Sequence, residues 1–215
     1  MKENETMNKN VWKKRFYILA GVNIGVLLLL TLYFYSPVPK VDIEKERTAY
    51  KLEDSSEFIV RSTKHHVNNL VNAYLDKLLA NTDHQFYINI DEEVQLFGEI
   101  PIFSSTVPLV VNFEPVVQEN GDLSLKQKSI SVGDLKLPNK KIMQYIEQYL
   151  PTPEWVVINP REEEIYVKVT EMDIKSNFHV AVHAFDLETN NIAFKFDVPY
   201  KTLGIDSLAK KGLNN

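Results

Sequence analysis

The sequence contains no cysteine and only seven glycines among 215 residues. Without cysteine the chain has no disulfide framework, no thiol nucleophile and no residue to carry the lipid of a lipoprotein. That composition is unusual for a secreted animal module and ordinary for a bacterial envelope protein, which favours a bacterial origin. The glycines do not cluster, so the sequence also lacks a glycine-rich loop that would cradle a phosphate.

Charge is absent from the run between Phe16 and Tyr35. A helix of that length rises about 30 Å, the thickness of a bilayer's hydrocarbon core. Three basic residues at 13–15 precede the run, so the positive-inside rule predicts a cytoplasmic N-terminus and a domain on the extracellular side. A cleaved signal peptide is the alternative, but the length of the run and its aromatic end favour an uncleaved single-pass anchor in the cell membrane.

Three residues inside this run are candidates for association between membrane helices. Gly21 and Gly25 form a small-xxx-small pair, with Asn23 between them. Small residues let two helices approach closely, and an amide in lipid favours a partner. Glycine is also common in membrane helices, so the motif alone does not establish a dimer.

The rest of the chain is acidic. Residues 1–15 hold five basic and two acidic residues, a net charge of +3, and the total of −5 leaves −8 for the remainder. This charge argues against nucleic acid as a partner. We expect five segments, namely a basic cytoplasmic tail, a transmembrane helix, a stalk, an extracytoplasmic α+β domain and a C-terminal tail, at 1–15, 16–35, 36–56, 57–200 and 201–215.

The first soluble helix is predicted from a cap at Ser62 or Thr63 to about Ala80. Its apolar stripe recurs at three- and four-residue steps and consists of Val67, Leu70, Val71, Tyr74 and Leu78. The asparagines of this segment are expected on the opposite, polar side. A second helix is predicted from Pro138 to Pro151, since proline favours the first turn.

Alternating apolar residues predict strands in the remaining segments. These are 58–60, 86–90, 94–102 with a bend at Gly98, 107–113, 123–132, 155–158, 164–170, 178–186 and 192–198. Asn120-Gly121 predicts a two-residue hairpin loop, and Pro115 indicates an edge or a break. The change of alternation in 123–132 predicts a bulge near Gln127 and Lys128. Short links favour a mainly antiparallel, strongly bent sheet packed on two amphipathic helices, an α+β fold.

No familiar catalytic pattern is present. His179 and His183 lie in a strand pattern, where roughly 13 Å separates them, so they cannot share a metal ion. HExxH and G-x-S-x-G motifs are absent. Glu162, Glu163 and Glu164 are interpreted as a solvated turn. We therefore expect no enzyme, no catalytic residues, no metal and no cofactor, although paired carboxylates from distant segments would leave no local signature.

The apolar pattern is instead the main functional signal. A packed core explains every stripe, and a lipid-binding groove in a curled sheet is the alternative. The groove would be lined by Val67, Leu70, Val71, Tyr74, Leu78, Val111 and Phe113.

The order of landmarks resembles a known family. A membrane helix is followed by TKHHVNNLVNAYL, then FGEIPIFSSTVPLVVNFEPVVQENGDLSLKQKSISVGDLKLP, then a short helix and LPTPEWVVI. Along nearly the whole chain this resembles the YpmS-like family of uncharacterised membrane-anchored proteins of Gram-positive bacteria. The FEP, ENGDL and SVGDLKLP segments carry the resemblance most specifically, and the family supplies no catalytic residues to transfer. The element order also resembles a tubular lipid-binding (TULIP-like) module at the level of fold.

Two hypotheses of function follow. The first is a membrane-anchored extracytoplasmic protein that binds a lipid or a lipid-linked envelope intermediate. The second is an accessory module that positions or regulates a cell-envelope enzyme or transporter. The second predicts a filled core and an exposed apolar or edge-strand patch, near Pro115 or in the tail after Tyr200.

Overall fold

The structure is a computed structural model that describes residues 3–35, 55–102, 105–133, 135–172, 174 and 177–202. The chain divides into two units, residues 1–38 and 39–215. The predicted stalk, apart from its last two residues, and the tail from residue 203 onward lie outside the described residues. Each unit is described by itself below.

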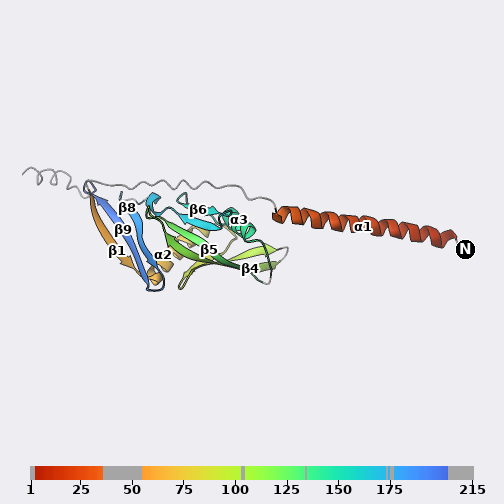
Figure 1. The fold of residues 1–215 in the computed structure, drawn as a ribbon, viewed down its shortest axis with the longest axis horizontal. Coiled ribbons are helices and arrows are strands. Elements are labelled where there is room, and N and C mark those ends of the chain that lie inside the picture. The colour runs from red at the N-terminus through yellow and green to blue at the C-terminus, as the bar shows by residue number, and fades with distance from the viewer. Residues whose placement is uncertain are drawn as a thin grey trace, which may run out of the picture. The chain divides into compact units, whose positions relative to one another are not determined.

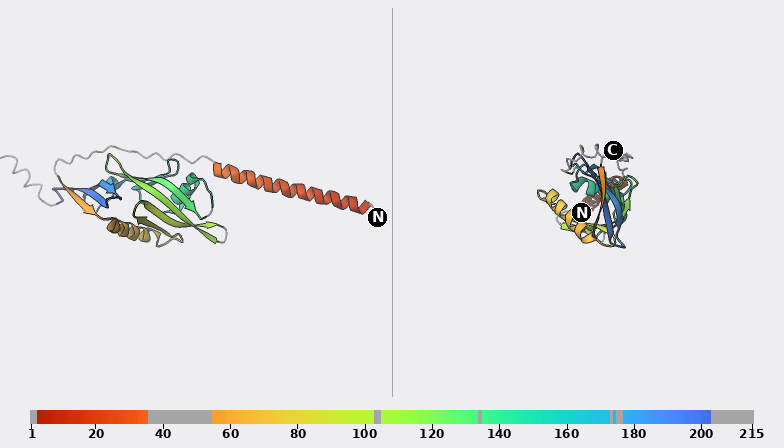
Figure 2. Two further views of the ribbon diagram at one scale, coloured as in Figure 1. Left: turned by 60° about the horizontal axis from the view of Figure 1, so that its bottom comes forward. Right: turned by 90° about the vertical axis from the view of Figure 1, so that its left-hand side faces the viewer.

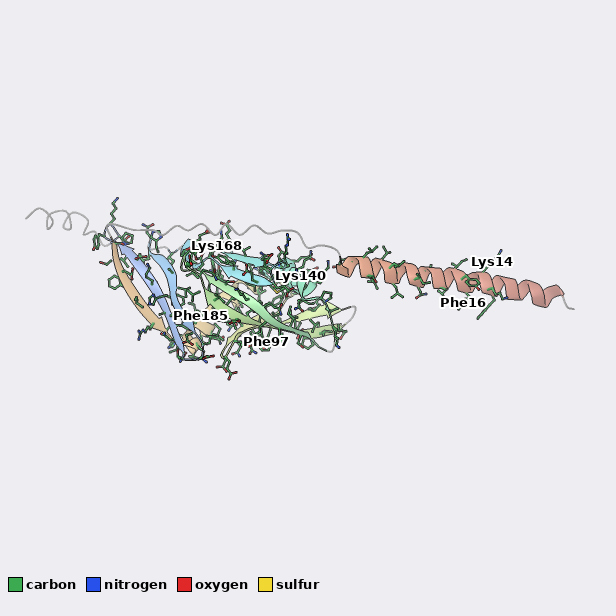
Figure 3. All side chains as sticks on the ribbon, in the orientation of Figure 1. Lys14, Phe16, Phe97, Lys140, Lys168 and Phe185 are labelled. Carbon is green, nitrogen blue, oxygen red and sulfur yellow. The ribbon has the colours of Figure 1, made fainter. Side chains whose placement is uncertain are left out.

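The first unit contains helix α1 (Glu3–Tyr35), which begins well before the apolar run. Within the described chain, its segment Trp12–Tyr33 is the one helix long and apolar enough to cross a membrane. Side chains such as Phe16 project from it on all sides (Figure 3). The expected membrane helix is therefore present as a candidate span. Its orientation stays a prediction, because a secretory signal sequence would meet the same criteria.

The second unit contains two antiparallel sheets (Figure 1). One has three strands in the order β1-β9-β8, and the other has six in the order β2-β3-β4-β5-β7-β6. Figure 2 shows the strong bend of the long strands, which curls the six-stranded sheet into a half-barrel. The strands are β1 (Ser55–Ser62), β2 (Phe86–Ile90), β3 (Val94–Ile102), β4 (Ser105–Val117), β5 (Leu123–Val132), β6 (Val156–Asn159), β7 (Glu164–Val167), β8 (His179–Asp186) and β9 (Asn191–Pro199).

Two helices pack with these sheets, as the α+β prediction requires. Helix α2 (Lys64–Leu79) has Thr63 as its N-cap, where the Thr63 hydroxyl accepts from the backbone N–H of His66. Helix α3 (Asn139–Tyr149) follows Pro138 and buries Ile142, Met143 and Ile146. These side chains belong to the same buried core as the inward residues of β4.

The predicted bulge is confirmed in the pairing of β4 with β5. Asn112 lies opposite Ser129 and Phe113 lies opposite Gln127, so Lys128 is the extra residue. The bulge changes which alternate residues face the core, as the shift in the apolar pattern indicated. Lys128 forms an ion pair with Glu93 in the turn between β2 and β3.

Four boundaries differ from the sequence prediction. The hairpin loop after β4 has three residues and not the predicted two. It lies between Gln118 and Asp122, where the backbone N–H of Gln118 donates to the Asp122 carbonyl. Strand β4 extends to Val117, beyond the predicted end at Phe113. At Pro115 it pairs with β5 alone, because β3 begins opposite Phe113, so the predicted edge at the proline is confirmed. Strand β7 is shorter than predicted and is followed by a 3₁₀ helix, η1 (Val169–Glu171). Strand β1 is longer, with eight residues.

Candidate binding surfaces and a buried polar cluster

The seven residues predicted to line a groove do not form one accessible surface. Val111 and Phe113 of β4 are completely buried, with 0 and 1% of their surface exposed. On α2, by contrast, Leu70 is 71% exposed and Tyr74 is 39% exposed. The remaining three are buried or half-buried, namely Val67, Val71 and Leu78. The predicted set is therefore divided between the core and the outer side of α2.

Two asparagines explain how α2 is oriented. The side-chain oxygen of Asn72 accepts from the backbone N–H of Ile88 at 2.8 Å, and its amide donates to the Ile88 carbonyl at 2.7 Å. The side chain of Asn68 accepts from the N–H of Ile90 at 3.0 Å. These bonds cover the outer edge of β2, which is an end strand of its sheet. The asparagines therefore face the protein and not solvent.

This orientation rotates the buried face of α2 away from the predicted stripe. At 100° per residue, the buried face is centred roughly 60° from the predicted stripe, toward Leu75 and Leu79. Leu70 and Tyr74 are left at the exposed margin, where the Tyr74 ring lies 5.7 Å from the ring of Trp155, just before β6. Helix α2 thus contacts segments at both edges of the curled sheet.

A second apolar surface lies on the three-stranded sheet and was not predicted as a site. Strand register places Val180, Phe196 and Phe58 side by side, and the next row holds Val182, Phe194 and Val60. Val180 and Val182 are buried, and Phe194 and Phe196 pack against the core. Phe58 and Val60 are about half exposed, at 52 and 49%. We call these six residues the inner-face strip.

The inner-face strip is uncharged, whereas the opposite face of the same strands carries charge. Register and alternation place Glu57, Arg61, Lys195 and Asp197 on that outer face. There the Lys195 ammonium lies 3.3 Å from the Glu57 carboxylate. The strip therefore leads from the packed core to the surface without a polar interruption. The alternation of apolar residues in 192–198 was the sequence signal for the inner-face strip. It does not reveal that the neighbouring residues of β1 are the exposed end of the strip.

A buried polar cluster holds the β4–β5 hairpin in place. The Asp122 carboxylate, only 3% exposed, accepts four hydrogen bonds. Thr170 donates two, from its backbone N–H at 3.0 Å and its hydroxyl at 2.8 Å. The Asn120 amide donates at 2.7 Å and the Tyr166 hydroxyl at 3.1 Å. These residues come from the hairpin, β7 and η1, so the cluster joins segments that are 48 positions apart.

Burial also changes the chemistry of Tyr166. Loss of hydration raises the pKa of the Tyr166 hydroxyl to about 12, and the nearby Asp122 carboxylate acts in the same direction. The phenol is therefore a hydrogen-bond donor at any physiological pH. Because it already donates to Asp122, the cluster fits a structural clamp better than a proton-transfer site.

The same cluster brings the hairpin tip against the three-stranded sheet. Gly121, at φ +89°, accepts through its carbonyl from the N–H of Val182 at 2.7 Å. A Cβ atom at Gly121 would lie 2.6 Å from the Cβ of Ala181, so only glycine fits this approach. The tip therefore covers the edge of β8 that does not pair with β9.

The interpretation of the three glutamates as a solvated turn is wrong for Glu164. This residue begins β7, is 8% exposed and accepts from the Ser124 hydroxyl at 2.8 Å. The paired strand register of β5 and β7 draws it inside, where the serine satisfies one carboxylate oxygen.

The histidines do not assemble into a site. His183 is the extra residue of a bulge in β8, between Val182 and Ala184, and it is exposed. His179 lies at the start of the same strand. Among the described residues, no group of three or more His, Cys, Asp or Glu side chains has the arrangement to hold a metal ion.

The three association candidates lie in the middle of α1. The Asn23 amide donates to the Leu19 carbonyl of its own helix at 2.8 Å, so this hydrogen bond needs no second helix. Cβ atoms added at Gly21 and Gly25 would meet no other atom within 4 Å. Both positions thus leave room for a close neighbour, and association stays a prediction.

Comparison with known proteins identifies the family. Residues 10–198 match the family described as "Uncharacterized protein conserved in bacteria (DUF2140)". The chain is also 31% identical over 193 residues to "Uncharacterized protein YpmS" of Bacillus subtilis (strain 168), covering 88% of this chain and 98% of that protein. No solved structure matches the chain, so the likeness to tubular lipid-binding modules stays a prediction. The chain belongs to this bacterial, YpmS-like family, as its landmarks indicated.

Proposed function

We propose that this family member is a membrane-anchored, extracytoplasmic binding protein, and not an enzyme, that holds the acyl part of a lipid or of a lipid-linked envelope intermediate. The observation that carries the proposal is the inner-face strip, which extends from the core to the half-exposed Phe58 and Val60. An acyl chain offers no hydrogen bonds and gains by covering such a strip. An anchoring helix would keep this surface near the membrane, where lipids are abundant.

The position of the site differs from the groove that the sequence suggested. Val111 and Phe113 are completely buried and offer no surface to a ligand, so we assign the contact to exposed residues. Leu70 and Tyr74, on the helix that follows β1, add further exposed apolar surface. Ligand uptake in this proposal therefore needs no opening of the packed core.

A photo-crosslinking experiment tests this proposal. The full-length protein would be reconstituted in phosphatidylglycerol liposomes with a small fraction of phosphatidylglycerol that carries a diazirine near the acyl-chain end. After irradiation and proteolysis, mass spectrometry should find adducts on peptides containing 58–60 and 194–196, besides α1. Adducts confined to α1 would refute lipid binding by the domain.

Matched variants make the result specific. Replacing both Phe58 and Val60 by serine removes up to about 2 kcal/mol of apolar contact, so the domain adducts should fall about tenfold or more. Tyr87→Ser is the control, because Tyr87 is an exposed aromatic residue on β2 with a similar exposed fraction of 55%. It should leave the yield unchanged. An equal loss in both variants would indicate a general effect on reconstitution.

The accessory-module hypothesis is supported by a different observation. Phe58, Ile59 and Val60 are all about half exposed on an end strand, so they form an apolar edge-strand patch of the kind that this hypothesis uses. The patch is not at the predicted places, because Pro115 is half-buried and the tail from residue 203 lies outside the described residues. In vivo crosslinking from β1 that recovered one envelope protein in place of lipid would favour this second function.

A further inference from the structure

Strand β1 has one edge that pairs with no other strand in the described part of the chain. The other three edge strands of the two sheets, β2, β8 and β6, are either covered or short. The β2 edge is bonded by Asn72, the β8 edge by Gly121, and β6 is only four residues long. Exposed edges pair readily with other strands, and natural proteins usually cover, charge or shorten them. The eight-residue β1, with three exposed apolar residues, has none of these protections at its centre.

The sequence of β1 is complementary to itself in the antiparallel direction. Its central seven residues are Ser56, Glu57, Phe58, Ile59, Val60, Arg61 and Ser62. When two copies align about a twofold axis at Ile59, Glu57 lies opposite Arg61 of the second copy, and Phe58 lies opposite Val60. Opposite charges and apolar pairs directly across a strand pair are stabilising.

From this pattern, we propose that the free edge of β1 binds β1 of a second copy, antiparallel and centred on Ile59, to form a continuous six-stranded sheet across a twofold dimer. The two Glu57–Arg61 pairs would lie on the outer face, where Glu57 already contacts Lys195 at 3.3 Å. The inner-face strips of the two copies would meet, with Phe58 beside Val60 of the partner copy. This inference does not depend on whether the strip binds lipid.

Only this register satisfies the charges. If the axis moves by one residue, to position 58 or 60, Ile59 lies opposite Glu57 or Arg61, respectively. If the axis lies midway between two residues, Val60 lies opposite Glu57 (axis between 58 and 59) or Phe58 lies opposite Arg61 (axis between 59 and 60). Each of these leaves a charge against an apolar side chain. The charge pattern therefore specifies a second copy of this strand as the occupant and fixes its register.

Confinement of both copies to one membrane by α1 would assist such a small interface. A seven-residue strand pair buries little surface by the standard of stable dimers, but tethering raises the effective concentration of the two edges. Gly21 and Gly25, which leave open space on α1, are compatible with a second copy in the membrane as well.

Disulfide trapping in the full-length protein tests the proposal, because the natural chain has no cysteine to interfere. Across the proposed axis the two Cβ atoms at position 59 lie about 5 Å apart, close to the separation that a disulfide needs. Ile59→Cys should therefore give a covalent dimer on mild oxidation in proteoliposomes. Tyr87→Cys, equally exposed on the covered strand β2, should give at least tenfold less.

The register is tested by a second set of variants. Glu57→Cys alone places two thiols roughly 13 Å apart, too far to react, whereas Glu57→Cys co-reconstituted with Arg61→Cys should form a mixed disulfide. Equal yields from I59C and Y87C, or from E57C alone and the E57C plus R61C mixture, would overturn the proposal. Ile59→Lys, which sets two ammonium groups on the axis, should weaken dimerisation of the cysteine-free protein at least tenfold, as counted by photobleaching of labelled copies in nanodiscs. An unchanged count would also overturn it.

Discussion

The clearest test of the folded structure is removal of the buried Asp122 carboxylate. Asp122→Ala takes one acceptor group away from four donors, contributed by Asn120, Tyr166 and Thr170. A buried donor without an acceptor costs about 1–3 kcal/mol. Asn120 and Thr170 are only half-buried, so water can replace part of their loss, whereas Tyr166 is 1% exposed and cannot be rescued in this way.

One effect acts in the opposite direction. Loss of the carboxylate also removes the cost of keeping a charge away from water. Four bonds of good length outweigh that gain, and we expect a net decrease of about 3 kcal/mol in the free energy of unfolding. Asp122→Asn keeps the shape and the bonds from Thr170 but turns an N–H₂ group toward the Asn120 amide. It should lose about 1–2 kcal/mol.

Asp186 provides a matched control on the surface. Its carboxylate accepts from the N–H and hydroxyl of Thr189 and from the N–H of Glu188, much as Asp122 does with Thr170. Asp186 is exposed, so Asp186→Ala should cost only about 0.5–1 kcal/mol, since water replaces the lost acceptor.

The measurement is urea unfolding of the full-length protein in detergent, followed by the fluorescence of Trp155. Trp12→Phe in the background removes the signal of the other tryptophan, which lies in α1. The reasoning fails if D122A and D186A differ by less than about 1 kcal/mol, because burial of the cluster would then contribute little.

Three further predictions use the same unfolding assay. Because burial raises the pKa of Tyr166 to about 12 from an ordinary 10, its contribution is complete below pH 10 and is lost as pH rises through 12, and Tyr166→Phe should remove this alkaline loss. Asn72→Leu should cost about 2 kcal/mol and speed amide exchange on β2, whereas Asn69→Leu, on the exposed side of α2, should change neither. Gly121→Ala should cost about 2 kcal/mol or more through its contact with Ala181 and its positive φ, and Ala181→Gly in the same chain should recover the part due to the clash.

The sequence pattern of a short segment was sufficient to predict those features that depend on that segment and on the residues next to it in the chain. The bulge at Lys128 was predictable because the apolar residues change from odd to even positions on either side of it. A cap at Ser62 or Thr63 was predictable because a hydroxyl before an amphipathic run satisfies a free N–H of the first turn, and the structure shows that Thr63 is the cap. The antiparallel pairing followed from links too short for crossovers, but the sequence analysis expected one sheet and the strands form two.

Contacts between distant segments were not predictable in the same way. The orientation of α2 depends on the bonds of Asn68 and Asn72 to β2, and polar residues on a helix normally face water. The Asp122 cluster joins residues 48 positions apart, and the ENGDL segment suggested only a turn. Glu164 was placed in solvent because nothing in its neighbourhood indicates that Ser124 lies opposite.

The two edges of the three-stranded sheet connect the buried cluster with the proposed dimer. One edge, on β8, is covered by the hairpin tip that Asp122 holds, and the other, on β1, pairs with no strand in the described part of the chain. A sheet with one free edge forms a closed twofold dimer, whereas a sheet with two free edges can add copies without limit. Asp122→Ala should therefore shift the protein in nanodiscs from dimers toward larger assemblies. Adding Ile59→Lys to that chain should block the β1 contact and hence growth through it. Assemblies of D122A that persist unchanged with I59K would show that they do not grow through β1.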